Sequence, residues 1–350
     1  MVQPQLAPAT GGRLVSLDAF RGATIALMIL VNTAGMFRQQ YAPLRHAEWH
    51  GWTITDTVFP SFLWIVGVSI ALARPKSVAV ILRRGAILFG LGLFLYGVPH
   101  FDVSTWRILG VLQRIAICYV AAALIHRYFT ARAWIVWTAA LLVAYSVLMS
   151  QGTFDVEGNF AHAVDRMVLG AHNYSETKTW DPEGVVSTLP AIATALFGLL
   201  AGHVVRKPVT LSERTTWLFL TGNVLIVAGL ICHAWMPINK KLWTTSFAVF
   251  MAGLDYAALA ACLWIIDGQG FRRWARPFVI FGMNAIAMYM LSELGEVLLT
   301  LTGWRMAIHD ALFASWLSAD NASLAYSLAY TAMMFVAAYA MYRRNWFVRV

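Results

Sequence analysis

The stretch Ile54-Thr-Asp-Thr-Val-Phe-Pro-Ser-Phe-Leu-Trp-Ile-Val-Gly-Val-Ser-Ile-Ala-Leu-Ala73 decides the fold class of this chain. A helix of about 20 apolar residues crosses the roughly 30 Å hydrocarbon core of a bilayer, and this stretch has that length and composition. It also carries an acid, Asp56, and a proline, Pro60, within its first turns. Because an ionisable side chain at the edge of a membrane is costly to desolvate, Asp56 marks a candidate functional site.

The rest of the chain has the same apolar character. Of its 350 residues, 59% are hydrophobic and 12% are charged, about half the charged fraction of soluble domains. The mean hydropathy is +0.64. Hydrophobic runs recur with short polar connections, which predicts one integral membrane domain over residues 13–350 after a disordered tail over residues 1–12. The three cysteines lie inside apolar runs, with no metal spacing and no disulfide framework.

Ten segments are long and apolar enough to be membrane-spanning helices. The predicted fold is therefore an all-α polytopic bundle of about ten transmembrane helices. A further segment, residues 303–318, is too short and too polar to span and is predicted to be an interfacial helix. The ten predicted spans are residues 19–37, 54–73, 81–99, 107–126, 132–150, 185–205, 215–235, 243–266, 277–299 and 323–342.

Lysine and arginine counts predict how the bundle is oriented, because cytoplasmic loops carry the excess. With the N terminus inside, 17 of these residues fall on the cytoplasmic side and 8 on the opposite side. Both termini are therefore predicted to be cytoplasmic. The net charge of +9 follows from the same bias, and no nucleic-acid partner is expected because no basic stripe with interleaved aromatic residues is present.

The outer loop His46-Ala-Glu-Trp-His-Gly51 precedes the opening stretch and holds two histidines. An imidazole can accept and return a proton near neutral pH, which makes His46 a candidate general base. Asp56 could orient that histidine or bind a cationic amine. The alternative is that the histidines are surface residues and the tryptophans form an interfacial aromatic belt. Because the loop is predicted to be irregular, no zinc site is expected.

The first predicted span carries Asp18, Arg21 and Asn32. On a helix, Arg21 and Asn32 lie about 20° apart around the axis and roughly 16 Å apart along it. One elongated ligand could therefore touch both. Asp18 is predicted to form a local ion pair with Arg21, and the alternative for Asn32 is a bond to a neighbouring helix.

Arg114 lies inside the fourth predicted span, where a cation requires a partner. The candidate acids within predicted spans are Asp56, Asp255 and Glu293, and the sequence does not choose among them. A structural ion pair and a ligand contact are both compatible with this position. In either case, Arg114→Leu is expected to abolish activity or folding.

Two further outer segments hold polar clusters. Asp181 and Glu183 flank a proline at a predicted helix start, where acids favour the helix dipole and could also bind a sugar amine. Asn239 and Lys240, with Lys241, form the second cluster.

Seven blocks of sequence, in order along nearly the whole chain, resemble the transmembrane acyltransferases related to heparan-α-glucosaminide N-acetyltransferase. They are Ser16-Leu-Asp-Ala-Phe-Arg-Gly22, the Asn32 helix, His46-Ala-Glu-Trp-His-Gly51 running into Asp56 and Phe59-Pro60, Gly110-Val-Leu-Gln-Arg114, Asp181-Pro-Glu-Gly184, Pro237-Ile-Asn-Lys-Lys-Leu-Trp243 and Gly282-Met-Asn-Ala285.

The resemblance implies transfer of an acetyl group from cytoplasmic acetyl-CoA to the amine of a glucosamine-type sugar on the other side of the membrane. The lysosomal relatives carry an extra luminal segment ahead of the bundle, and no such segment is expected here. The resemblance therefore implies a bacterial inner-membrane form, in contact with the lipid bilayer, acting on chitin-derived or cell-wall aminosugars. A homodimer is compatible with these features.

Carried over by position, the family's catalytic histidine falls on His46 and its catalytic asparagine on Asn32. His46 would be the general base or carry the acetyl group transiently, and Asn32 would stabilise the oxyanion of the thioester carbonyl. Position 50, an asparagine in the mammalian members, is His50 here, which leaves open whether it assists and whether the acceptor differs. Asp56, Arg114, Asp181, Glu183, Asn239 and Lys240 are the candidates for substrate binding or support.

The phosphates of CoA require arginine or lysine partners. The candidates are Arg21, Arg83, Arg84, Arg272 and Arg273, each of which could instead serve only the cytoplasmic charge bias. No metal is expected. Two other functions suit the same composition: a transporter or permease for an aminosugar or acylated glycan, and an O-acyltransferase of the same architecture.

Overall fold

A computed structural model describes residues 14–34, 39–98 and 100–348, so the predicted tail over residues 1–12 lies outside the described residues. Every regular element in these ranges is a helix, and no β-strand occurs among them. The α-helices are α1 Val15–Asn32, α2 Ile54–Leu72, α3 Val78–Gly97, α4 Val111–Tyr128, α5 Ala131–Met149, α6 Phe160–Val168, α7 Thr188–Arg206, α8 Leu211–Cys232, α9 Thr245–Cys262, α10 Arg276–Met283, α11 Ala285–Leu301, α12 Trp304–His309 and α13 Ala319–Arg343.

The prediction of a polytopic helical membrane protein is confirmed. Eight helices of the described chain are long and apolar enough to cross a bilayer, and α10 with α11, bent by 82°, makes a ninth if the two form one broken span. The remaining predicted span, residues 107–126, coincides with α4, which is less apolar because it carries Gln113, Arg114, His126 and Arg127. Residues 303–318 form two short pieces, α12 and a π-helical turn over Asp310–Ala314. The placement of these pieces at a membrane interface stays a prediction.

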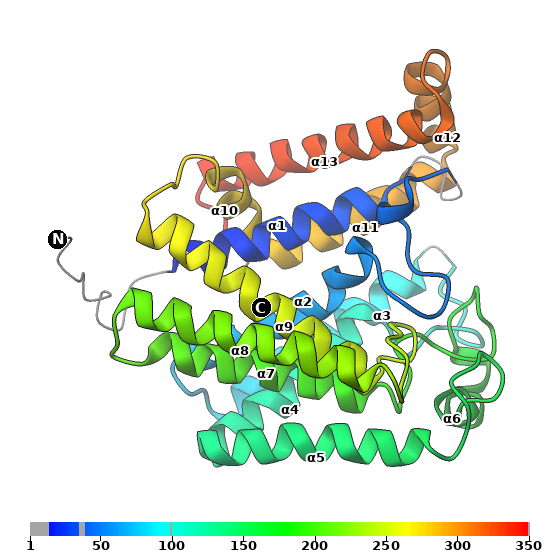
Figure 1. Ribbon diagram of the computed structural model, residues 1–350. Coiled ribbons are helices and arrows are strands. Elements are labelled where there is room, and N and C mark those ends of the chain that lie inside the picture. The colour runs from blue at the N-terminus through cyan, green and yellow to red at the C-terminus, as the bar shows by residue number, and fades with distance from the viewer. Residues whose placement is uncertain (1–13, 35–38, 99, 349–350) are drawn as a thin grey trace.

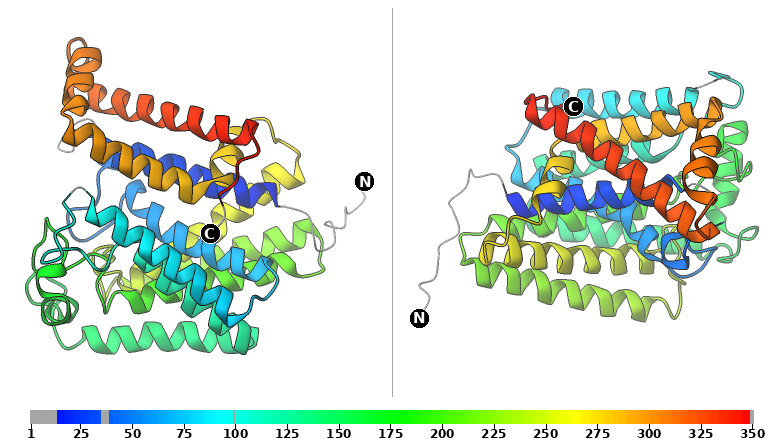
Figure 2. Two further views of the ribbon diagram at one scale, coloured as in Figure 1. Left: turned by 180° about the vertical axis from the view of Figure 1, so that it is seen from behind. Right: turned by 90° about the horizontal axis from the view of Figure 1, so that it is seen from above.

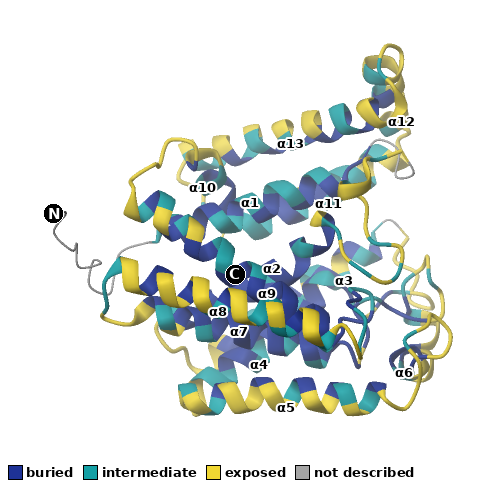
Figure 3. Cartoon of the chain, in the orientation of Figure 1, coloured by how far each residue is buried: buried dark blue, intermediate teal, exposed yellow. Residues whose placement is uncertain are grey.

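The helices run side by side (Figure 1), with a buried centre and exposed flanks (Figure 3). In the most apolar 18-residue stretch of α7, 72% of the residues are buried, whereas in that of α8 22% are buried. Helices α2, α7 and α9 form the middle of the bundle, whereas α5, α8 and α13 turn exposed faces outward (Figure 3). Because those exposed faces are apolar, they suit contact with lipid rather than water.

The bundle has two distinct ends. At one end α1 begins, α13 ends and residues 73–77 join α2 to α3, and we call this the arginine-rich end (Figures 1 and 2). At the other end lie the loops over residues 39–53, 151–187 and 233–244, and we call this the histidine end (Figure 1). The loops that the sequence places together on one side therefore do meet at one end of the bundle.

Helices α1 and α10 cross at two glycines. A Cβ atom on Gly22 would lie 1.6 Å from the Phe278 carbonyl oxygen, and one on Gly282 would lie 2.1 Å from the Asp18 carbonyl oxygen. Glycine is needed at both positions because the obstacles are backbone atoms, which cannot rotate away as a side chain can. This contact fixes α1 against α10.

Gly22→Ala should therefore destabilise the protein by about 1 to 3 kcal/mol, the usual effect of overpacking a tight interface. The measurement is the thermal unfolding midpoint in detergent. Gly90→Ala is the matched control, because nothing lies within 4 Å of a Cβ atom at that helical glycine. An equal midpoint for both variants would contradict the close crossing.

Candidate active site

The histidine end holds a histidine–aspartate pair. His46 Nδ1 lies 2.7 Å from Asp56 Oδ1, and Asp56 Oδ2 accepts hydrogen bonds from the backbone N–H groups of Ala47 and Thr53, each at 3.0 Å. Asp56 is the third residue of α2 and caps its N terminus, which explains an acid at that place. Its carboxylate is 1% exposed, whereas the His46 side chain is 48% exposed. The buried acid therefore holds a histidine whose ring remains accessible.

The pairing indicates which ring nitrogen carries the proton. A carboxylate that already accepts two backbone N–H groups can only accept again, so His46 Nδ1 donates to it and Nε2 keeps its lone pair. Partial burial and the Lys240 ammonium lower the pKa of His46, while the bond to Asp56 acts in the opposite direction. The result is a histidine that is neutral near pH 7 and can accept a proton.

The loop between α8 and α9 packs on the His46 loop. The Gly51 N–H donates to the Ile238 carbonyl oxygen at 2.8 Å, and Lys241 Nζ donates to the Glu48 carbonyl oxygen at 2.6 Å. Lys240 Nζ lies 3.1 Å from His46 Nδ1. Segments nearly 200 residues apart in sequence therefore build one site.

Asp181 and Glu183 share one arginine, Arg107. Arg107 Nε and Nη2 donate to Asp181 at 2.7 and 2.6 Å, and Nη2 also donates to Glu183 at 2.5 Å. Its guanidinium carbon lies 4.7 Å from the ring centre of Tyr96 and 4.4 Å from that of Tyr174. All three charged groups are buried. The sequence does not indicate this partner, although Arg107 lies three residues before the motif Gly110–Arg114.

Two consequences follow for these acids. The prediction that Asp181 and Glu183 lie at the start of a helix is wrong, because α7 begins at Thr188 and no acid lies in its first turn. Burial raises the pKa of Asp181; for Glu183 the cations of Arg107 and Arg114 outweigh burial and lower it. The two carboxyls are thus satisfied within the protein and hold the loop before α7.

The predicted partners of Arg114 are also wrong. Within the described chain, Arg114 donates to the Gly184 carbonyl oxygen at 3.0 Å and to the Ser187 hydroxyl, and its guanidinium lies over the ring of Trp243 at 5.2 Å. The three candidate acids have other partners: Asp56 bonds His46, Asp255 accepts from Ser61 at 2.5 Å, and Glu293 accepts from Asn32 at 3.5 Å. Arg114 is almost fully buried and supports the same loop as Arg107.

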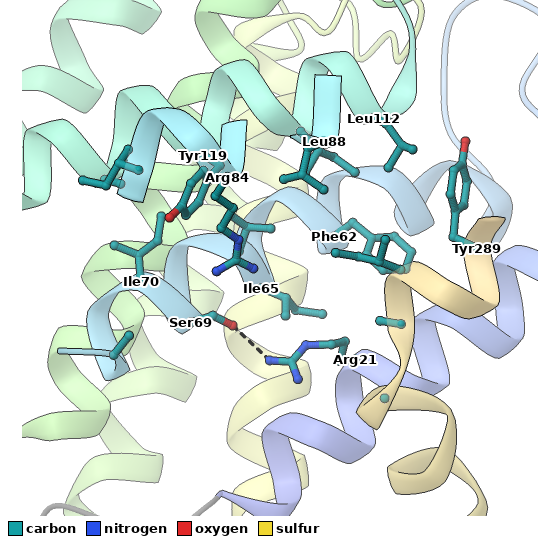
Figure 4. A pocket seen from close by; sticks show the side chains of 18 of the residues that line it. Arg21, Phe62, Ile65, Ser69, Ile70, Arg84, Leu88, Leu112, Tyr119 and Tyr289 are labelled. Carbon is teal, nitrogen blue, oxygen red and sulfur yellow. Dashed lines mark hydrogen bonds between the residues drawn. The ribbon is translucent and has the colours of Figure 1, made fainter. Parts of the chain in front are cut away.

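A cavity of about 400 Å³ runs through the bundle from the arginine-rich end. Arg21 and Arg84 project into it from α1 and α3, with Ser69 between them accepting a hydrogen bond from Arg21 Nη2 at 2.9 Å (Figure 4). Tyr119 lies under Arg84, 4.8 Å from its guanidinium carbon. The cationic residues that line this cavity are Arg21, Arg74, Lys76, Arg84 and Arg127.

The other predicted phosphate ligands lie elsewhere. Arg83 is exposed, and Arg272 and Arg273 are not among the described residues that line the cavity. Arg74, Lys76 and Arg127 were not singled out in the sequence, since loop cations at that end all suit the charge bias. The predicted ion pair of Asp18 with Arg21 is present at 3.0 Å.

The inner end of the cavity is apolar and leads toward Asn32. Ile25 and Met28 continue the face of α1 that begins with Arg21, and all three line the cavity. Asn32 lies one turn beyond Met28 on that face, about 6 Å along the axis. On α11, Glu293 lies one turn beyond the lining residue Tyr289 and accepts the Asn32 bond.

The segment after α13 returns to the cavity. Asn284, at the break between α10 and α11, donates to the Trp346 carbonyl oxygen at 3.0 Å and accepts from the Val348 N–H at 2.9 Å. Val348 itself lines the cavity. Asn284 therefore fixes the end of the described chain at this site.

Comparison with known proteins identifies the family. The family described as heparan-alpha-glucosaminide N-acetyltransferase, catalytic, matches residues 13–231. The mouse heparan-alpha-glucosaminide N-acetyltransferase is 24% identical to this chain in an alignment of 422 positions. The alignment covers 99% of this chain and 62% of the mouse protein. The human protein of the same name is 25% identical, over 97% of this chain and 60% of its own length. The chain thus spans about three fifths of these relatives, and it belongs to the heparan-alpha-glucosaminide N-acetyltransferase catalytic family.

Proposed function

We propose that this protein is a transmembrane N-acetyltransferase, which moves an acetyl group from acetyl-CoA at the arginine-rich end to the amine of a glucosamine-type sugar at the histidine end. The observation that carries the proposal is the cavity, which has cations near one end and whose lining approaches Asn32 to within one helical turn. The names of the curated relatives agree with it.

The cavity suits the shape and charge of the donor. The phosphates of CoA would lie among the five cations, where arginine can form paired charge-assisted hydrogen bonds. The long pantetheine arm would follow the apolar walls formed by Ile65, Leu88 and Leu112. The thioester would then lie near the inner end, beside Phe62 and Tyr289 (Figure 4).

The transfer step uses His46 and Asn32. The acceptor nitrogen attacks the thioester carbonyl carbon while His46 Nε2 takes its proton, and the Asn32 amide N–H groups stabilise the oxyanion. Collapse of the tetrahedral intermediate breaks the carbon–sulfur bond and releases CoA thiolate, which takes the proton from His46. In the alternative route, His46 Nε2 attacks the thioester first, which breaks the carbon–sulfur bond and releases CoA thiolate. The amine then takes the acetyl group from Nε2, and its proton passes to the thiolate. Asp56 holds the ring in either route.

The acceptor amine has fewer protein acids to bind than the sequence indicates. Asp181 and Glu183 are satisfied by Arg107, so we propose that they shape the site through the loop before α7. Asn239 is fully buried, and its Oδ1 accepts a hydrogen bond from the Leu242 N–H at 2.9 Å. We therefore propose that Asn239 supports the turn before α9.

The experiment that tests the function is acetyl transfer by the purified protein in proteoliposomes with labelled acetyl-CoA. Label should pass to glucosamine and not to N-acetylglucosamine, whose amine is blocked. Label on both sugars would show an O-acyltransferase instead. Sugar uptake into the vesicles without label transfer would show a transporter.

The proposed orientation places both termini in the cytoplasm and the histidine end outside the inner membrane of a bacterium. A cysteine introduced at the exposed Glu48 should then react with an impermeant thiol reagent in intact cells. Labelling only after lysis would reverse the orientation while leaving the chemistry intact.

Arg84→Gln should raise the KM for acetyl-CoA by about 10- to 100-fold, because a hydrogen bond to a charged group contributes roughly 1.5 to 3 kcal/mol. Initial rates at varied acetyl-CoA concentration provide the measurement. Arg83→Gln is the matched control, since Arg83 is adjacent in sequence but exposed and outside the cavity lining. Equal KM values for the two variants would exclude Arg84 from the donor site.

A further inference from the structure

Lys240 lies against the ring of His46. Its Nζ is 3.1 Å from His46 Nδ1, 3.5 Å from Nε2 and 3.6 Å from Asp56 Oδ1. The Lys240 side chain is 21% exposed, so the ammonium is largely shielded from solvent. Such a position is unusual for a lysine unless the surrounding chain holds it there.

The turn that carries Lys240 is fixed on both sides. Asn239 Oδ1 accepts from the Leu242 N–H at 2.9 Å, and the Asn239 N–H donates to Thr244 Oγ1 at 3.1 Å. The Gly51 N–H bonds the Ile238 carbonyl oxygen and ties the turn to the His46 loop. The contact between Lys240 and His46 is therefore built into the backbone.

The two close contacts of His46 Nδ1 cannot both be hydrogen bonds. A protonated Nδ1 can donate to Asp56, and an unprotonated Nδ1 can accept from Lys240, but one atom cannot do both. The shorter contact, 2.7 Å against 3.1 Å, is the one with Asp56. Lys240 therefore places a positive charge beside a ring whose Nδ1–H already points elsewhere.

A second proton on the ring would bring two cations together. The charged groups that act on His46 are Asp56 from α2 and Lys240 and Lys241 from the loop before α9. Arg45 and Glu48 belong to the same loop as His46, and both are exposed. Glu183, from the segment before α7, faces Lys240 rather than His46. The single carboxylate that touches the ring is thus opposed by two ammonium groups.

We propose that Lys240 is a positioning residue that keeps His46 neutral, with the Nδ1 proton on the side of Asp56 and Nε2 unprotonated. This assignment rests on the proposed function for its catalytic meaning. Asp56 alone would favour the imidazolium form, which cannot take a proton from an amine. Lys240 counters that tendency while Asp56 still orients the ring.

The test measures the protonation of His46 without using catalysis. Diethyl pyrocarbonate acylates neutral imidazole, so its rate of reaction at residue 46, followed by peptide mass spectrometry from pH 5 to 8, reports the midpoint of titration. In Lys240→Met this midpoint should rise by about one pH unit, the usual effect of removing a like charge. Lys240→Arg should leave the midpoint within a few tenths of the wild-type value.

Lys241→Met is the matched control, because Lys241 bonds the Glu48 carbonyl oxygen and its charge is the smaller influence on His46. Its midpoint should move less than that of Lys240→Met. A wild-type midpoint above that of an unperturbed histidine, or an unchanged midpoint in folded Lys240→Met, would overturn the inference. If the midpoint shifts as expected but no acetyl transfer is found, the inference stands and the proposed function fails.

Discussion

His46→Ala should lower the rate of acetyl transfer by about 10²- to 10⁴-fold, the usual contribution of a general base. The loss should appear in kcat, because the imidazole is proposed to act on the reacting amine rather than on the bound donor. The KM for acetyl-CoA should change little, since His46 does not line the cavity. Steady-state transfer assays on the purified variant provide the measurement.

His50→Ala is the control for this prediction. His50 lies in the same loop and is also exposed, but its Nδ1 lies 3.5 Å from the Asn239 amide nitrogen rather than beside an acid. Its rate should stay within a few-fold of wild type. Full activity of folded His46→Ala would remove His46 from the mechanism.

The role of His46 as a neutral base also determines how the rate of acetyl transfer depends on pH. The reaction requires neutral His46, and the pKa of His46 is lowered from its ordinary value of about 6.5. The rate should therefore fall on the acid side only as the pH drops below that value, and it should be at its plateau at pH 7. A profile that rises as the pH falls from 7 would contradict a neutral base.

Arg107→Met should destabilise the protein by about 3 to 5 kcal/mol, because removing one partner leaves buried charges without compensation. Here two carboxyls, Asp181 and Glu183, lose the cation that both bind. The unfolding midpoint in detergent should fall. The difference in midpoint between the variant and the wild type should become smaller as the pH drops and the carboxyls take protons. This sign follows because the bond to Arg107 stabilises the ionised acids.

Arg114→Met is the matched comparison. Arg114 is as deeply buried but bonds a carbonyl and a hydroxyl, and the Ser187 hydroxyl can still donate to the Gly184 carbonyl oxygen at 3.2 Å without it. Arg114→Met should therefore destabilise the protein less than Arg107→Met does. Equal unfolding midpoints for Arg107→Met and wild type would show that the ion pairs of Arg107 with Asp181 and Glu183 contribute nothing to stability.

The helices and the local pairs were predictable from the sequence. Hydrophobic runs are continuous along the chain, so the helix over Ile54–Leu72 begins at the predicted residue, and the Asp18–Arg21 pair follows from helical spacing alone. The His46 loop was predictable as irregular, and no helix runs from Arg45 to Thr53. These features depend on neighbours within a few residues.

The partners of the buried charges were not predictable in this way. Arg107 and Asp181 are 74 residues apart, and the acids predicted as partners of Arg114 all lie inside predicted spans. The neutral partners of Arg114, a carbonyl and a hydroxyl, leave no pattern in the sequence. The cavity likewise draws its cations from four separate segments, so only the arrangement of the bundle shows that Arg84 lines it and Arg83 does not.

The bond of Asn284 to residues 346 and 348 also bears on how the protein is handled. Val348 lines the cavity, so an affinity tag or fluorescent protein fused directly after Val350 would begin two residues beyond a lining residue. Bulk or charge added there competes for space with whatever occupies the cavity. Purification and imaging are better served by a fusion before Val15, where α1 begins at the same end of the bundle without lining the cavity at that residue.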